Sequence, residues 1–103
     1  MRHLLWYLIA GTKGGINRAK ILLLLHDRPY NAHQLAKELE LDYKTVRHHL
    51  DVLEKNRLIE PIKKGEYGSP YVLSIYMEQN YDSFQDIWKK IKIEREERKK
   101  SGT

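Results

Sequence analysis

Apolar residues recur at helical spacing in the first half of the chain and predict two helices in succession. Residues 16–27 include a run of four leucines, so nearly the whole circumference is apolar and this helix should be central. Pro29 ends that segment. Residues 32–39 follow with amphipathic spacing, and Asn31 with Gln34 three positions on is typical of a capping box at the helix start.

A third helix is predicted over residues 42–57, where Asp42 is placed to cap the first turn. At 100° per residue, three apolar side chains share the face that should pack on the core: Val46, Leu50 and Leu53. The opposite face is polar and carries Lys44, His48 and Lys55. Two short helices, a tight turn and a longer helix with a basic outer face predict a helix-turn-helix.

Two short runs with strand character come next, over residues 58–64 and 70–75, and the glycines of residues 65–69 mark a turn between them. Three residues of the second run alternate to one face: Tyr71, Leu73 and Ile75. Pro61 lacks an amide hydrogen and should lie where no ladder bond is required. A hairpin directly after the third helix predicts the wing of a winged helix over residues 58–75.

The terminal segments are also apolar. Residues 77–100 predict a long helix with a seam at 4-3-4-3 spacing, formed by Met77, Tyr81, Phe84, Trp88 and Ile91. Residues 3–10 form a solid apolar run that periodicity assigns to neither helix nor strand. Either the seam packs on its own domain, or the two termini pair across a two-fold axis. A small winged helix already has a core, so we expect a homodimer, with an interface of Leu4, Leu5, Leu8, Tyr81, Phe84, Trp88 and Ile91.

The chain of 103 residues therefore predicts one domain, mainly α with a small β-hairpin wing. Its parts are an N-terminal apolar segment (1–13), a winged-helix core (14–76) and a C-terminal helix that serves dimerisation (77–100).

Composition adds a charge argument and excludes several classes of site. The formal net charge is +5, which favours a polyanionic partner only weakly. The absence of cysteine excludes disulfides and thiolate metal sites, and we expect a cytoplasmic protein. The apolar residues 4–10 are too short for a membrane span of about 20 residues. No small-residue cleavage pattern of a signal peptide follows them, so no membrane association is expected.

Two further patterns resemble chemical sites but do not meet their requirements. The "GTKGG" of residues 11–15 has its lysine in the wrong order for a phosphate-binding loop, so an ordinary loop is expected. Five histidines are present, yet the adjacent His48 and His49 point about 100° apart on a helix and cannot easily chelate one ion. We therefore predict no metal site and no cofactor.

Three stretches in order carry a resemblance to a known family: "GGINRAKILLLL", "NAHQLAKELELDYKTVRHHLDVLEKNRLI" and the "GEYG" of the wing. They resemble the winged helix-turn-helix regulators of the ArsR type, and especially small archaeal members. The likeness covers residues 14–76. The commonest version of the pattern has glycine where this chain has Glu40, and a non-glycine residue with positive φ there costs on the order of 1 kcal/mol.

The resemblance implies that the chain binds double-stranded DNA, usually as a dimer, to control transcription. Helix 42–57 would enter the major groove, where its basic side chains can donate to guanine or to phosphate. Wing 58–75 would reach the backbone or the minor groove. The predicted DNA-contacting residues are Tyr43, Lys44, Thr45, Arg47, His48, Lys63, Lys64 and Tyr67.

Alternatives remain at several of these positions. Lys63 and Lys64 could simply keep a hairpin edge soluble. His49 is expected to pack beside the core, whereas Arg18 and Lys20 could touch a phosphate. The whole fold could instead serve as a protein-interaction module. No nucleophile, base and orienting group stand at motif spacing, so we do not expect an enzyme. The sequence neither indicates nor excludes a small-molecule effector.

Overall fold

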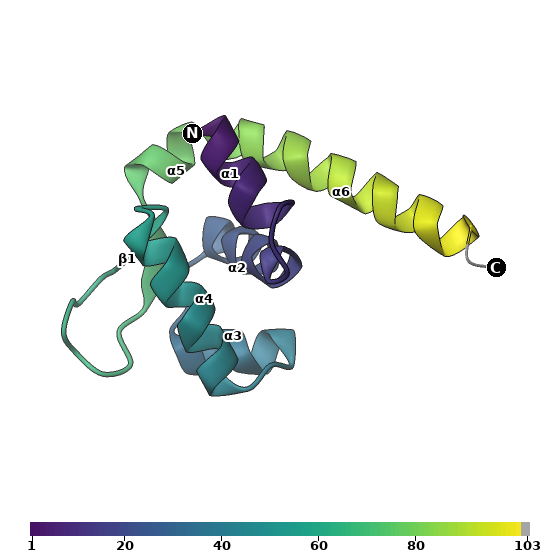
Figure 1. The fold of residues 1–103 in the computed structure, drawn as a ribbon. Helices are drawn as coiled ribbons and strands as arrows, with labels where there is room; N and C mark the ends of the chain where they lie inside the picture. Colours follow the sequence, from purple (N-terminus) through teal and green to yellow (C-terminus); the bar gives the residue numbers. More distant parts are fainter. Residues whose placement is uncertain (102–103) are drawn as a thin grey trace.

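The computed structural model describes the backbone of residues 1–101 and the side chains of residues 1–97. Within residues 1–101, six helices and two strands follow one another (Figure 1). In order, they are α1 (Arg2–Ile9), α2 (Gly15–Asp27), α3 (Ala32–Leu39), α4 (Tyr43–Lys55), β1 (Ile59–Pro61), β2 (Tyr71–Leu73), α5 (Ile75–Gln79) and α6 (Tyr81–Ser101). The predicted architecture, mainly α with a hairpin wing, is confirmed.

Helix α2 lies at the centre of the fold, as its apolar circumference predicts. It contacts α1, α3, α4 and β2, and Ile21 and Leu22 are completely buried. The N-terminal run, which periodicity could not assign, is the helix α1. It packs against both α2 and α6, so the first segment of the chain is part of the core.

The helix-turn-helix consists of α3 and α4, joined by a tight connection. The capping box is confirmed: the Gln34 amide donates to Asn31 Oδ1 at 2.8 Å, and the Asn31 amide donates to Gln34 Oε1 at 2.8 Å. Glu40 ends α3 with φ 55° and ψ 42°. This is the left-handed conformation that glycine adopts without strain, so Glu40 accepts a cost of about 1 kcal/mol to make the turn.

Helix α4 is shorter than predicted: it ends at Lys55 and not at residue 57. Arg57 has φ 61°, which turns the chain out of the helix. The Leu58 amide then donates to the Leu53 carbonyl at 3.0 Å, and the Leu58 side chain enters the core. Helical periodicity gives no sign of this turn.

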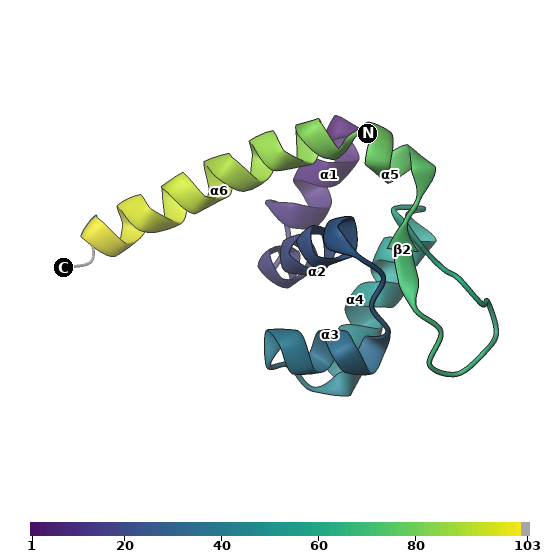
Figure 2. The ribbon, with the colours of Figure 1, turned by 180° about the vertical axis from the view of Figure 1, so that it is seen from behind.

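The wing is an antiparallel pair of three-residue strands, with Ile59 opposite Leu73 and Pro61 opposite Tyr71. Both strands are shorter than predicted, and the loop between them spans residues 62–70. On its other side β2 meets Tyr30, whose carbonyl accepts from the Tyr71 amide at 2.8 Å. Figure 2 shows β2 between the wing loop and the helices.

The predicted alternation of β2 fails at its end. Ile75 does not lie on the face shared by Tyr71 and Leu73, and its side chain is 75% exposed. The reason is Ser74, whose hydroxyl accepts from the Met77 amide at 3.0 Å. This bond caps a helix, so the chain leaves the strand one residue before Ile75.

The predicted helix over residues 77–100 is in fact two helices, α5 and α6, separated at Asn80. Asn80 has φ −111° and ψ 14°, and its side-chain amide donates to the Tyr76 carbonyl at 2.9 Å. Its own carbonyl accepts from the Phe84 amide in the first turn of α6. Asparagine thus ends one helix and begins the next, because its side chain competes for backbone groups.

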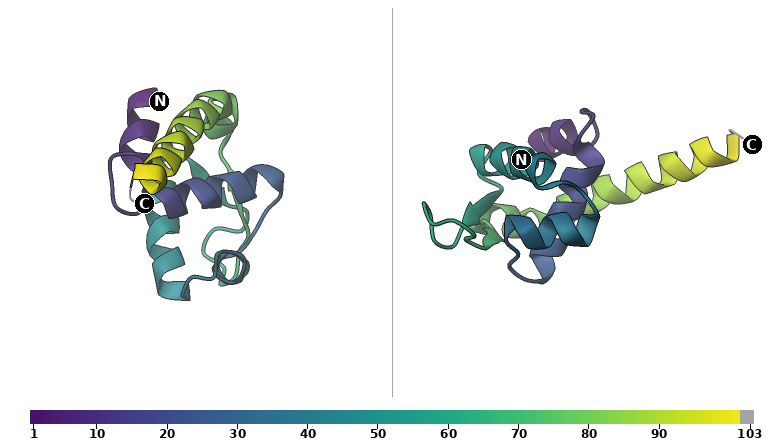
Figure 3. Two further views of the ribbon diagram at one scale, coloured as in Figure 1. Left: turned by 90° about the vertical axis from the view of Figure 1, so that its right-hand side faces the viewer. Right: turned by 90° about the horizontal axis from the view of Figure 1, so that it is seen from below.

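The apolar seam of α6 packs on its own chain, against α1. Five of the seven side chains predicted at a dimer interface are buried in this single core: Leu5, Leu8, Tyr81, Phe84 and Ile91. These five side chains are covered by their own chain, and the dimer interface stays a prediction. Leu4 and Trp88 are partly buried against the same core. The C-terminal half of α6 runs on past the other helices (Figure 3).

Candidate nucleic-acid interface

Helix α4 is anchored at its start and along its inner face. The Asp42 carboxylate accepts from the Thr45 amide at 2.7 Å and from the Thr45 hydroxyl at 2.9 Å. Both bonds hold the pKa of Asp42 below its usual value, and the bond from the Thr45 amide has the larger effect. Val46, Leu50 and Leu53 are completely buried, as predicted. The first turns of α4 are therefore fixed in orientation, with a defined outer face.

The outer face of α4 exposes the basic side chains that the wheel predicts. Lys44 and His48 are exposed on its first two turns, and Lys55 on its last. Asp51 is exposed between them. Thr45 is half-buried, and its hydroxyl already donates to Asp42. Thr45 is thus first of all part of the helix cap, whereas Lys44 and His48 are free to meet a ligand.

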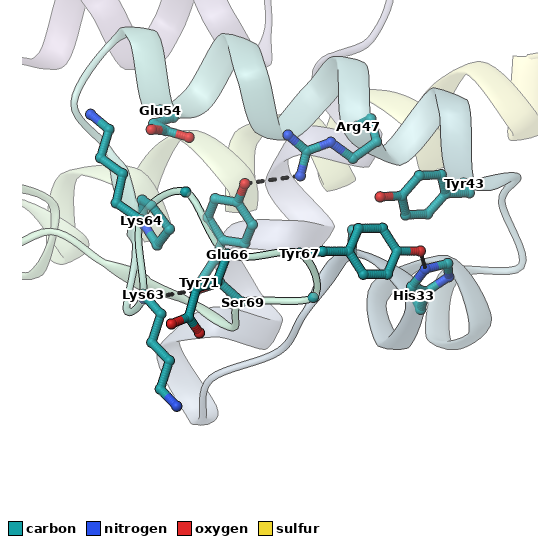
Figure 4. Close-up of a pocket in the computed structure, with 14 residues that line it drawn as sticks. His33, Tyr43, Arg47, Glu54, Lys63, Lys64, Glu66, Tyr67, Ser69 and Tyr71 are labelled. Carbon is teal, nitrogen blue, oxygen red and sulfur yellow. Dashed lines mark hydrogen bonds between the residues drawn. The ribbon is translucent and has the colours of Figure 1, made fainter.

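Arg47 points to the wing rather than straight outward (Figure 4). Its Nη1 donates to the hydroxyl of Tyr71 on β2 at 2.9 Å, and its Nη2 lies 3.1 Å from the Asp51 carboxylate. This bond to the Tyr71 hydroxyl is the main cause that raises the pKa of Arg47. Arg47, whose side chain is 36% exposed, links α4 to the wing.

The tip of the wing returns to the helix-turn-helix through an aromatic cluster. The Tyr67 hydroxyl and His33 Nε2 are hydrogen-bonded at 2.6 Å, and the His33 ring stacks on Tyr43 with centroids 4.3 Å apart. Tyr67 is nevertheless 82% exposed. Sequence reasoning missed His33, because its place near the start of α3 gives no sign that the wing reaches it.

A space of about 580 Å³, hereafter the wing groove, lies between α4 and the wing. The lysines predicted to contact DNA, Lys63 and Lys64, are exposed along it. Its lining includes three basic and two acidic side chains, namely Arg47, Lys63, Lys64, Glu54 and Glu66. The charges on this side of α4 therefore nearly balance.

The other side of α4 contains a buried polar pair that the sequence did not reveal. Arg18, predicted as a possible phosphate contact, is only 5% exposed. Its Nε donates to the Leu8 carbonyl at 3.0 Å, its Nη1 lies 3.3 Å from His49 Nδ1, and its Nη2 bonds the Thr12 hydroxyl. Arginine has donors only, so His49 Nδ1 is the acceptor. Arg18 thus joins α1, the following loop and α4.

Burial affects the pKa of both members of this pair. It lowers the pKa of Arg18, although arginine stays protonated. It also lowers the pKa of His49, and the positive charge of Arg18 and the neighbouring His48 lower it further. His49 is 5% exposed and is a packing residue, as the sequence suggests. It accepts the bond from Arg18 in its neutral form.

The glycines of "GTKGG" fit this arrangement sterically. A Cβ on Gly15 would lie 1.7 Å from the Ile9 carbonyl oxygen. A Cβ on Gly14 would lie 2.6 Å from His49 Cε1 and 2.7 Å from Arg18 Nη1. Close packing against α1 and α4 therefore accounts for Gly14 and Gly15.

The described residues form neither a cluster that could hold a metal ion nor a helix that could span a membrane. Among those residues, no three histidine or carboxylate side chains gather closely enough to hold a metal ion. Over the same residues, none of the helices has the length and apolar character needed to cross a bilayer.

Comparison with known proteins agrees with this geometry. Residues 17–60, under half of the chain, match the family model of bacterial regulatory proteins of the arsR family. An uncharacterized HTH-type transcriptional regulator of Methanocaldococcus jannaschii is 49% identical over 43 residues. That match covers 42% of this chain and 45% of the relative, so this chain spans less than half of its length.

Solved structures with the same fold are more distant in sequence. The transcriptional regulator BldR of Sulfolobus solfataricus superposes with a TM-score of 0.70 at 12% identity, over 90% of this chain and 69% of that one. HlyU of Vibrio cholerae superposes with a TM-score of 0.60 at 21% identity, over 84% of this chain and 81% of that one. At such identities the likeness is one of fold. Residues 17–60 are accordingly similar to arsR-family regulatory proteins, and they lie in a chain with the winged-helix fold.

Proposed function

We propose that this chain is a sequence-specific regulator of transcription that binds double-stranded DNA in the cytoplasm. The observation that carries the proposal is the first part of α4. Its inner face is buried and its start is capped, so Lys44 and His48 are held outward on a rigid helix. The major groove, about 12 Å wide, admits such a helix.

The side chains around α4 divide into two expected roles. Lys44 can donate to guanine O6 and N7, and His48 can contact either a base or a phosphate. Lys63, Lys64 and Tyr67 on the wing would meet the backbone or the adjacent minor groove. Arg47, held by Tyr71 at 2.9 Å, sets the angle between helix and wing. Tyr43 supports the wing tip through His33.

The proposal includes a homodimer, although not through the seam first predicted. The C-terminal half of α6 extends beyond the body of the chain (Figure 3), and the side chains of residues 92–97 are all exposed. Helices rely on tertiary packing for most of their stability, so a partner is expected there. Tyr7 of α1 and Ile93 of α6, exposed at 61% and 51%, supply apolar surface.

A dimer would also suit the DNA, because it would place two α4 helices about 34 Å apart, one helical turn. Ile93→Asp tests it: Ile93 is outside the core, so the variant should fold but become monomeric by light scattering. Ile62→Asp in the wing loop, where Ile62 is 52% exposed, is the matched control. If Ile93→Asp remains a dimer, α6 is not the interface.

Selection of bound fragments from a random DNA pool tests the main proposal. We expect a preferred, palindromic sequence. A salt series on that sequence should give a log–log slope of about −0.9 for each phosphate contacted. No enrichment and no affinity at physiological salt would refute DNA binding and would favour a protein-interaction module.

A further inference from the structure

A second hollow lies beside α4, on the side away from the wing. It has a volume of about 510 Å³ and is bordered by Lys13 and Gly14 of the loop before α2 and by Lys44, Thr45 and His48 of α4. We call it the loop hollow. Lys13, Lys44 and His48 are all exposed at its edge, whereas none of these three lines the wing groove.

The loop hollow has a larger excess of positive charge than the wing groove. Three basic side chains line it, Lys13, Arg18 and Lys44, against the single carboxylate of Asp42. Both Asp42 oxygens already accept bonds from Thr45. In the wing groove three basic side chains face two carboxylates. Both spaces therefore have a positive formal charge, and an anion beside α4 can be attracted to the loop hollow as well as to the wing groove.

The loop hollow and the wing groove lie on different flanks of one helix. At 100° per residue, His48 is displaced by about 100° and Thr45 by about 160° from Arg47, which faces the wing. A helix about 10–12 Å across nearly fills a major groove about 12 Å wide. The walls of that groove are the two sugar–phosphate backbones, so each flank of α4 meets a different strand.

We propose that Lys13, together with His48, binds DNA backbone phosphates on the strand opposite the one that the wing contacts, while Lys44 between the two flanks faces the bases. This inference rests on the proposed function and adds a contact to it. The loop is already fixed before DNA arrives. Arg18 bonds the Thr12 hydroxyl and His49, and Gly15 packs against Ile9. A pre-ordered contact loses little entropy on binding.

Lys13→Ala tests the contact, with Lys89→Ala on α6 as the control of equal charge. Both side chains are exposed, so thermal melts should match wild type. On the selected DNA, Lys13→Ala should reduce the magnitude of the log–log salt slope by about 0.9 for each protomer, hence about 1.8 for the dimer, and weaken binding equally for all sequences. Lys89→Ala should leave the slope unchanged.

Ethylation interference then assigns the strand. Within each half-site, the phosphates that lose their effect in Lys13→Ala should lie on one strand, and those lost in Lys64→Ala on the other. An unchanged slope, or losses on the same strand, would overturn the inference while DNA binding itself stands. If the wild-type chain binds no DNA, the proposed function fails and this inference with it.

Discussion

The two flanks of α4 are held by different kinds of contact. On the loop side, buried Arg18 bonds His49 and the Leu8 carbonyl, and Gly15 leaves no room for a side chain against Ile9. On the wing side the contacts are less buried, one partly and one fully exposed. They are the Arg47–Tyr71 bond and the bond between His33 and Tyr67, a residue that is itself largely exposed.

This difference teaches how one helix can combine a fixed and an adjustable support. Buried polar groups cost much when they lose their partners, whereas exposed ones exchange them for water. The loop side should therefore set the position of α4 rigidly. The wing can shift at a small cost in free energy, which suits an element proposed to follow the shape of the DNA backbone.

The largest difference is expected between two glycines. Gly15→Ala places a Cβ 1.7 Å from a backbone oxygen, so we expect a loss of about 3 kcal/mol or more in the free energy of unfolding. Gly68 in the wing has φ +77° and open space around it, so Gly68→Ala should cost about 1 kcal/mol. Urea denaturation measures both, and equal losses would remove the contrast between the flanks.

Two arginines give the next comparison. Arg18→Met leaves the Leu8 carbonyl and His49 Nδ1 without their donor. We therefore expect the free energy of unfolding to fall by about 2–3 kcal/mol. Arg47→Met should cost no more than about 1 kcal/mol, because Arg47 is partly exposed, while weakening DNA binding by loosening the wing. Chemical denaturation and a DNA titration of both variants separate the effects. The opposite order of stability would contradict the account.

Acid should act on the loop side through His49. Its pKa is lowered in the folded chain, mainly by burial, so below about pH 6.5 the unfolded chain binds more protons. The stability contribution is complete above that pH and is lost as the pH falls toward the folded pKa. Denaturation between about pH 8 and about pH 5 should therefore show that the free energy of unfolding falls less with acid in His49→Gln than in wild type. Identical profiles would show that His49 does not titrate in this way.

The smallest effect is expected at the wing tip. Tyr67→Phe removes the hydroxyl bonded to His33, and stability should change by no more than about 0.5 kcal/mol. Affinity for DNA should fall by about two- to threefold, because the wing is less well placed. Tyr76→Phe on α5, also exposed, is the control. A large loss of stability in Tyr67→Phe would mean that the wing is as firmly held as the loop.

Local signals in the sequence predicted much of the fold. The capping box at Asn31 and the inward face of α4 depend on residues three or four positions apart, which a single sequence shows directly. The break at Asn80 and the cap at Ser74 were missed. Both positions lie within apolar patterns that indicated one continuous element, and side-chain bonds to the backbone ended it.

The site was predicted only where exposure follows from the helix itself. Lys44 and His48 point outward because Val46 and Leu50 point inward. Contacts between residues distant in the chain could not be predicted from a single sequence. Arg47 meets Tyr71 24 positions away, and Arg18 meets His49 31 positions away. The apolar seam of α6 was assigned to a second copy, because the sequence did not show that α1 was a helix available to cover it.

The central claim, that the outer face of α4 enters duplex DNA, is tested most directly by following backbone amide resonances as the selected duplex is added. The account predicts that signals of residues 43–48, the loop at 11–15 and the wing at 63–67 shift at physiological salt, while those of residues 85–91, whose inner side chains pack in the core, do not. Shifts confined to α1 and α6, with residues 43–48 unaffected, would contradict it.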